Sequence, residues 1–195
     1  EGSLEHKRGD DKLGREKIRQ LIQLLESEEA SEEAIGRFVD LDSFYRFWAI
    51  EGLLGFWDGY SGNANNFFIY LNPKTDRFHF IPWGADALFR KRSMLNFDFR
   101  APVSVKTKGR VAYRLYQLPE SRERYRKTLH GLLEEHWGED KFLAECDRIE
   151  ALIKPHLNRE QYRFTKSLNG TRDFIEARRG DLMKETGDSM PAWRK

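Results

Sequence analysis

FWDGYSGNANNFFIYLNPKTDRFHFIPWGADALF, residues 56–89, is the stretch that decides the fold of this 195-residue chain. Two of its segments, NFFIYL (66–71) and RFHFIP (77–82), are rich in the aromatic and branched side chains typical of strands. The segment between them, NPKTD (72–76), is a strong turn signal. The stretch therefore predicts an antiparallel hairpin.

The register of this hairpin predicts where its flanking loops lie. The turn centres near Lys74 and Thr75, so pairing outward from it places Asn66 opposite Trp83. The loops beyond Asn66 and Trp83 should then leave the sheet at the same end. We expect a group of polar side chains to converge there: Asp58, Asn63, Asn65, Asn66 and Asp86.

The expected group suits two kinds of chemistry. Carboxylate and carboxamide oxygens are ligands for a hard cation such as magnesium, and a carboxylate beside a metal-bound phosphate can act as a general base. Taken singly, each residue has a simpler explanation, because Asp and Asn are common in turns, where they bind their own backbone. Their joint order, which is acid, Asn, hairpin, acid, is also the order in the catalytic half of a protein kinase. Neither H-R-D nor D-F-G occurs in the chain.

Helical periodicity surrounds the hairpin. Residues 14–29 predict an amphipathic helix, Ser31 is placed to cap a short second one, and residues 1–13 are expected to be irregular. A third helix, capped by Asp40 or Asp42 and ending near Gly55, is apolar over most of its circumference and should be buried. Further helices are expected at 111–118, 120–137, 140–153 and 171–186. The chain is predicted to be a single α+β domain over residues 1–195, mainly helical, with a small sheet carrying the site.

Composition narrows the functional classes. The net charge is +2 with both signs interspersed, which argues against a nucleic-acid partner because such proteins concentrate basic residues on one face. No apolar run approaches the length of a membrane span. The single cysteine, Cys146, excludes an internal disulfide and is expected to be a packed apolar residue.

Residues 38–156 resemble the CotH (spore coat protein H) kinase family of atypical protein kinases. The matching features are DLDSF at the start of the central helix, WDGY, NNFFIY and FHFIPWGAD, together with YRLYQLPESRERYRKTL and LLEEHWGEDKFLAECDRIEALIKPH towards the C-terminus. The resemblance implies the large lobe of a kinase-like fold. It also implies transfer of a phosphoryl group from ATP, with Mg²⁺, to Ser/Thr hydroxyls of a protein. Family habit further implies export to the cell surface, envelope or spore coat.

The resemblance assigns roles to particular residues. Asp58 would be the catalytic Asp that accepts or orients the proton of the acceptor hydroxyl. Asn66, with Asn65 as the near alternative, would lie beside the metal, and Asp86 would hold the magnesium that bridges the phosphates. Trp83 flanks the site and would pack the nucleotide base, although a role in core packing is as good an explanation.

The chain departs from the family pattern in two ways. Many members read W-D-x-D after the second strand, and Gly84 stands in place of the first acid. If that acid is the essential ligand the protein is impaired; we favour Asp86 in the role, because Gly84 leaves the backbone free to turn Asp86 inward. The small ATP-covering lobe is not recognisable and is expected upstream. Two alternatives therefore remain, an inactive scaffold or binding domain of the same fold and an unrelated metal-dependent hydrolase, although a hydrolase site usually includes His.

Two further features carry open interpretations. Residues 98–110, DFRAPVSVKTKGR, lie where an activation or substrate-binding segment would be expected. Glu51, on the buried helix before Asp58, would either orient the site or pair with an arginine.

Overall fold

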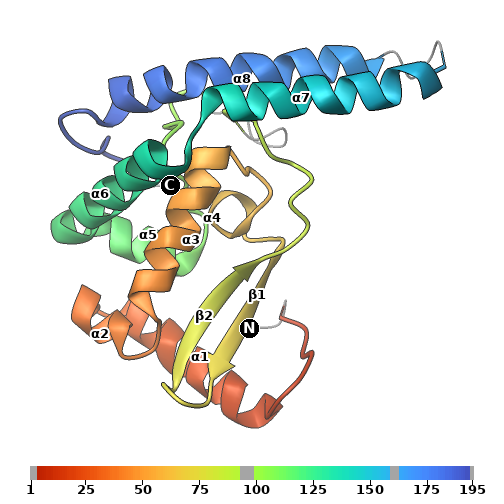
Figure 1. Cartoon of the computed structure of the whole chain (residues 1–195). Coiled ribbons are helices and arrows are strands. Elements are labelled where there is room, and N and C mark those ends of the chain that lie inside the picture. The colour runs from red at the N-terminus through yellow and green to blue at the C-terminus, as the bar shows by residue number, and fades with distance from the viewer. Residues whose placement is uncertain (1–3, 93–98, 159–162, 194–195) are drawn as a thin grey trace.

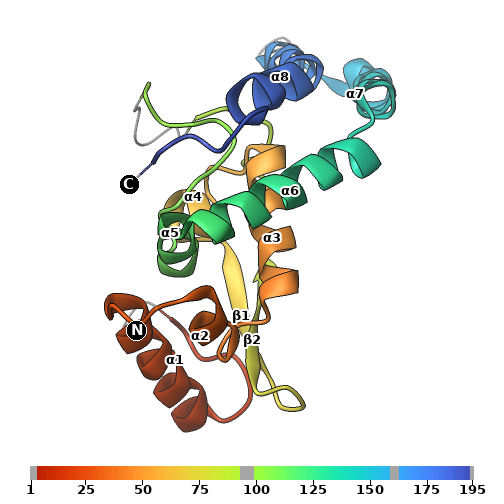
Figure 2. The ribbon, with the colours of Figure 1, turned by 90° about the vertical axis from the view of Figure 1, so that its left-hand side faces the viewer.

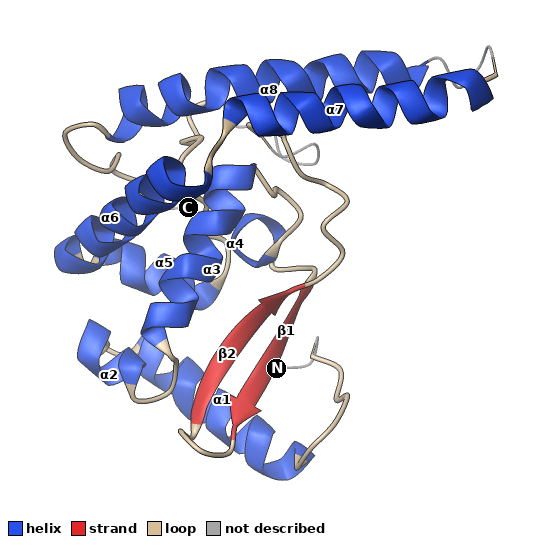
Figure 3. Cartoon of the chain, viewed as in Figure 1, coloured by secondary structure: helices blue, strands red, loops and turns tan. Residues whose placement is uncertain are grey.

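The chain folds as a set of helices with one hairpin packed beside the central helix, α3 (Leu41–Leu54) (Figures 1 and 3). The structure is a computed structural model that describes residues 4–92, 99–158 and 163–193. Its elements are α1 (Asp11–Glu26), α2 (Glu32–Gly36), α3 (Leu41–Leu54), α4 (Tyr60–Asn63), β1 (Phe67–Asn72), β2 (Arg77–Pro82), α5 (Arg110–Gln117), α6 (Pro119–His136), α7 (Glu139–Ile153), the 3₁₀ turn η1 (Lys154–His156) and α8 (Arg163–Thr186). The predicted α+β class, mainly helical with a small antiparallel sheet, is confirmed.

Helix α3 is the centre of the core, as its sequence predicts. Asp40 caps it by accepting a hydrogen bond from the backbone N–H of Ser43, and Gly55 ends it in the left-handed conformation, with φ +60°. The helix packs against α6 on one side and β2 on another (Figure 2), and Phe44 and Trp48 on it are completely buried. Because α3 ends at Gly55, the residues that follow form a loop at the upper end of the hairpin in Figure 1.

The hairpin has the predicted register. Strands β1 and β2 pair antiparallel with Asn72 opposite Arg77, so the turn is centred where the sequence indicates. At the other end, the backbone N–H of Trp83 donates to the carbonyl of Asn66 at 2.9 Å. The segment that enters α3 adds a short parallel bridge to β2, between Val39 and Phe78. The loops beyond Asn66 and Trp83 therefore start side by side.

The structure differs from the predicted elements most clearly at α1, α8 and α4. Helix α1 begins at Asp11 rather than at residue 14, because the Asp10 side chain caps it by accepting from the N–H of Leu13. Helix α8 begins at Arg163 rather than at residue 171, and it runs along α7 over this added length (Figure 1). Packing against α7 therefore outweighs the turn propensity of the residues around Gly170. Helix α4 is a single turn within a stretch that reads as turn chemistry.

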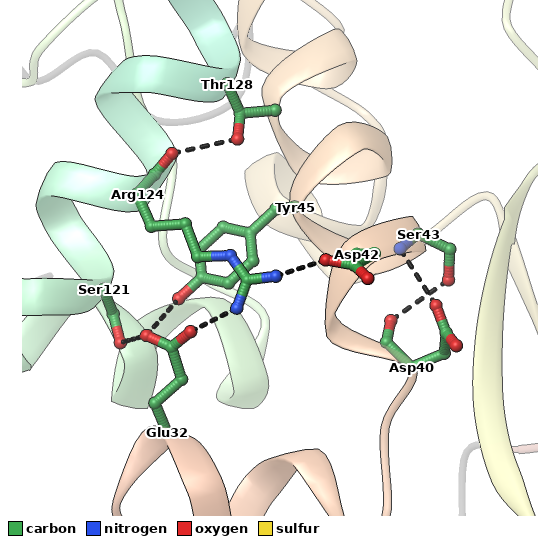
Figure 4. A network of polar contacts seen from close by, with 8 residues as sticks. All are labelled: Glu32, Asp40, Asp42, Ser43, Tyr45, Ser121, Arg124 and Thr128. Carbon is green, nitrogen blue, oxygen red and sulfur yellow. Dashed lines mark hydrogen bonds and ion pairs between the residues drawn. The ribbon is translucent and has the colours of Figure 1, made fainter.

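A polar network ties α2, α3 and α6 together beneath the core (Figure 4). The Glu32 carboxylate accepts hydrogen bonds from the hydroxyls of Tyr45 and Ser121 and from the guanidinium of Arg124. Arg124 also reaches Asp42 and lies over the Tyr45 ring at 4.6 Å. Partial burial raises the pKa of Glu32, but the bonds from Ser121, Arg124 and Tyr45 outweigh it and leave that pKa below its ordinary value. The network therefore favours the charged form of Glu32.

None of the helices in the described ranges is both long and apolar enough to cross a membrane.

Candidate active site

Three asparagine side chains surround the carboxylate of Asp58. Asn63 donates to its Oδ1 at 2.7 Å and Asn66 donates to its Oδ2 at 2.8 Å. Asn65 makes a longer contact to Oδ1 at 3.5 Å and is exposed, whereas Asp58 and Asn66 are half-buried. Three of the residues expected to converge at this end of the hairpin therefore contact Asp58, and Asn66 contacts it more closely than Asn65 does.

Glu51 stabilises the loop that contains Asp58. Its carboxylate is 2% exposed and accepts the backbone N–H groups of Tyr60 and Ser61, each at 2.8 Å. These N–H groups open α4, so Glu51 supplies the cap that turns this stretch into a helical turn. A Cβ on Gly59 would lie 2.3 Å from Glu51 Oε1, which explains why glycine stands there. Of the two roles open to Glu51, the structure therefore shows it bound to the loop rather than to an arginine.

Burial makes ionisation of the Glu51 carboxyl unfavourable. Burial raises the pKa of the Glu51 carboxyl, and the hydrogen bonds from Ser61 and Tyr60 only partly offset that effect. A buried carboxylate with an elevated pKa is retained here because the two N–H groups would otherwise be buried without partners.

Asn66 also connects Asp58 to the segment that follows β2. Its Nδ2 faces Asp58, and a Cβ added to Gly84 would lie 3.2 Å from its Oδ1. Gly84 is in the left-handed conformation, with φ +56°, as expected for a glycine that turns the chain. Asp86 is exposed, and its backbone N–H donates to the carbonyl of Gly84 at 2.8 Å. The convergence of the Asp86 carboxylate on Asp58 stays a prediction.

Trp83 lies at the rim of this site and not in the core. Its side chain is 62% exposed and meets the ring of Phe68 edge-on, with ring centroids 5.3 Å apart. Phe68 is on β1 and pairs with Ile81, so the two aromatic rings share the outer face of the hairpin. The core-packing interpretation of Trp83 is therefore wrong, and an aromatic surface lies next to Asn66.

Residues 103–109 form a fixed segment that passes behind the site. Side chains of α3, α6 and α8 bind its backbone groups. They are Glu185 for the N–H groups of Val103 and Ser104, Arg178 for the carbonyl of Val103, Tyr125 for that of Ser104, and Trp48 for that of Lys106. These residues belong to the segment 98–110 that is expected to bind substrate; Asp98, its first residue, lies outside the described residues.

The same segment brings a lysine to the site that sequence reasoning missed. Lys108 Nζ donates to Asn63 Oδ1 at 3.0 Å, and its backbone N–H donates to the carbonyl of Ser61 at 2.8 Å. Lys108 and Asn63 are far apart in the chain, and no local pattern links them. Only the path of the segment past α4 could have indicated this contact.

The side chains expected to bind magnesium, Asp86 and Asn66, have the ligand atoms that this ion prefers. Asp86 and Asn66 offer only oxygen, and the Asn66 oxygen points away from Asp58 towards the Gly84 side. A search of the described ranges for three or more His, Cys, Asp or Glu side chains able to hold a metal finds none. The expected set is of a different type, because it combines carboxylates with carboxamides.

Comparison with known proteins agrees with the resemblance seen in the sequence. No curated protein matches the chain. Residues 3–181 match the model of a protein family described as CotH kinase protein. The matched region extends on both sides of residues 38–156 and includes all of α1 and most of α8. The chain therefore belongs to the CotH kinase family.

Proposed function

We propose that this chain carries the catalytic centre of a protein kinase that transfers the γ-phosphoryl group of ATP, with Mg²⁺, to Ser/Thr hydroxyls of a protein. The observation that carries the proposal is the geometry of Asp58. Its carboxylate is half-buried and is held from both oxygens by Asn63 and Asn66, at the end of the hairpin where the Gly84–Asp86 segment also begins. Family membership supports a kinase-like activity.

Asp58 would act on the acceptor hydroxyl. The two amide donors fix the orientation of the carboxylate, so it need not reorient before it accepts the proton of the hydroxyl. As the hydroxyl oxygen bonds to the γ-phosphorus, its proton passes to Asp58 and the bond from phosphorus to the β,γ-bridging oxygen breaks, leaving ADP. Positioning of this kind supplies most of the catalysis in phosphoryl transfer.

Asp86 and Asn66 would hold the magnesium ion, and Trp83 would contact the nucleotide base. Bound magnesium would neutralise charge on the phosphates. The exposed face of Trp83, with the Phe68 ring beside it, offers a flat apolar surface on which a base can stack. Each of these assignments rests on residues at the same end of the hairpin as Asp58.

Gly84 favours a second candidate, a non-catalytic binding or scaffold domain. A Cβ added to Gly84 would lie 3.2 Å from Asn66 Oδ1. An acid at this position would therefore lie beside Asn66, and the chain lacks it. If Asp86 does not replace that acid, the site would bind magnesium weakly and transfer would be slow.

The test is phosphoryl transfer by the full-length protein with labelled ATP, magnesium and a general protein substrate. We expect label on protein with the wild type and near-background label with Asp58→Ala and Asp86→Ala. Asp140→Ala, at an exposed acid on α7, is the matched control and should label normally. Equal label in all four proteins would reject the residue assignment, whereas no label in any would favour the scaffold.

A further inference from the structure

Lys108 is held one carboxamide away from the carboxylate of Asp58. Its ammonium donates to Asn63 Oδ1 at 3.0 Å, and the Nδ2 of the same Asn63 donates to Asp58 Oδ1 at 2.7 Å. A cation and an anion are therefore joined through a neutral amide instead of forming an ion pair. Neither charge is cancelled by this contact, so both remain available to a third group that enters the site.

The backbone around Lys108 restricts where its ammonium can go. The N–H of Lys108 is bonded to the carbonyl of Ser61 in α4, and the carbonyl of Lys106 is held by the Trp48 indole at 2.8 Å. Val111, just beyond, donates its N–H to the buried hydroxyl of Tyr60. The side chain therefore starts from a fixed point beside α4, and its ammonium reaches the Asp58 side of that helix.

Stability alone does not explain this placement. Lys108 is exposed, and a hydrogen bond from an exposed lysine to an exposed or half-buried amide adds little to folding, because water competes for both groups. An ammonium also has three N–H donors, so the bond to Asn63 leaves it able to bind additional acceptors. A cation that is bonded to a neutral amide next to a candidate base is suited to an anionic ligand.

We propose that Lys108 is a further catalytic residue, whose ammonium binds the oxygens of the phosphoryl group during its transfer to the hydroxyl activated by Asp58. This rests on the proposed function. In the transition state, negative charge is spread over the three equatorial oxygens of the phosphoryl group. A cation placed beside these oxygens stabilises the transition state more than it stabilises bound ATP. Lys108 takes no proton in the step: the hydroxyl proton goes to Asp58 and the electron pair of the broken bond leaves with ADP.

A competing explanation is that Lys108 only positions Asn63. In that case any hydrogen-bond donor of similar length would replace it, and its loss would affect ground-state and transition-state complexes alike. The two roles are separated by measuring affinity for magnesium–ADP with and without aluminium fluoride, since the planar fluoride complex mimics the transferring phosphoryl group.

The experiment compares the full-length wild type with Lys108→Gln, Lys108→Arg and Lys127→Gln. Lys127 is exposed on α6 and provides the same change in charge away from the site. We expect Lys108→Gln to lower kcat by roughly 10²-fold with little change in the KM for ATP. It should weaken the aluminium fluoride complex far more than magnesium–ADP alone. Lys108→Arg should recover part of both losses, and Lys127→Gln should match the wild type.

The outcomes separate this proposal from the one on which it rests. If Asp58→Ala abolishes transfer while Lys108→Gln retains the kcat and fluoride affinity of the wild type, Lys108 is not catalytic and the kinase assignment stands. An equal loss in both nucleotide complexes would also overturn the proposal, in favour of positioning. If the wild type transfers no phosphoryl group but binds nucleotide, the fluoride comparison still decides the role of Lys108. A wild type that binds no nucleotide overturns both proposals.

Discussion

The indole N–H of Trp48 donates a hydrogen bond to the backbone carbonyl of Lys106 at 2.8 Å, which joins the central helix to the segment behind the candidate site. Lys106 is thereby held among charged neighbours. Burial and, to a smaller extent, the Arg178 guanidinium together lower the pKa of Lys106 to about 8, although Glu185 and Glu51 act in the opposite direction. The segment thus carries one half-buried lysine and another, Lys108, at the surface.

The first prediction concerns Lys106→Met. In the wild type, the folded protein releases a proton near pH 8 that the unfolded chain keeps until about pH 10.4, so stability increases with pH across that window. Removing the charge should therefore raise the melting temperature at pH 7, by about 2–4 °C for each kcal/mol gained. The advantage should shrink as the pH rises from 8 to 10. Thermal melts of both proteins at several pH values test this, and a constant difference would contradict it.

The second prediction concerns Glu51→Gln. A glutamine can accept only one of the two N–H groups that Glu51 binds, so a buried donor of Tyr60 or Ser61 loses its partner at a cost of about 1–3 kcal/mol. We expect α4 to shift and kcat to fall about 10-fold or more, with a smaller effect on the KM for ATP. Glu33→Gln, at an exposed glutamate of α2, is the control. A lower melting temperature with unchanged kcat would show that Glu51 serves stability alone.

The third prediction concerns the acid side of the stability profile. The folded-state pKa of Glu32 lies below its ordinary value, so its contribution to stability is present at neutral pH and is lost as the pH falls through that lowered pKa. Glu32→Gln should cost about 2 kcal/mol at pH 7, and the two proteins should converge in stability towards pH 3. Urea unfolding at pH 7, 5, 4 and 3 measures the difference. An equal difference at every pH would mean that the charge of Glu32 is irrelevant to the network in Figure 4.

The fourth prediction concerns Gly84→Asp. A side chain here adopts the left-handed conformation, which costs about 1–2 kcal/mol, and its Cβ approaches Asn66 Oδ1 to 3.2 Å. We expect a lower melting temperature together with tighter binding of magnesium–ADP, since a carboxylate is added beside Asn66. Gly84→Ala is the matched control, because it carries the same backbone strain without the acid. If both variants bind magnesium–ADP equally, the position does not face the metal.

The register of the hairpin and the end of α3 could both be predicted from the sequence. Pairing about Lys74 and Thr75 correctly places Asn66 opposite Trp83, because the register of a short hairpin is determined by its turn. The register brings only Asn66 and the segment after Trp83 together, whereas Asp58, Asn63 and Asn65 lie on the loop before β1. Gly55 is likewise the predicted end of α3, since a left-handed residue is the usual helix terminator.

The rest of the site depends on contacts between distant parts of the chain. The residues of α4 are typical of turns, so the sequence does not predict a helix there. The helix forms because Glu51 binds its first N–H groups. Lys108 reaches Asn63 because α3, α6 and α8 direct residues 103–109 past α4. Such contacts are set by tertiary packing, for which a single sequence carries no periodic signal.

The anchored segment also determines which changes of length the protein can tolerate. Side chains bind backbone groups of Val103, Ser104 and Lys106, so one inserted or deleted residue would offer the wrong carbonyl to Trp48 and carry Lys108 away from Asn63. The hairpin turn at residues 73–76 is exposed and can absorb extra residues into solvent. Insertions among related chains should therefore accumulate in that turn, and the spacing between Val103 and Lys108 should be preserved.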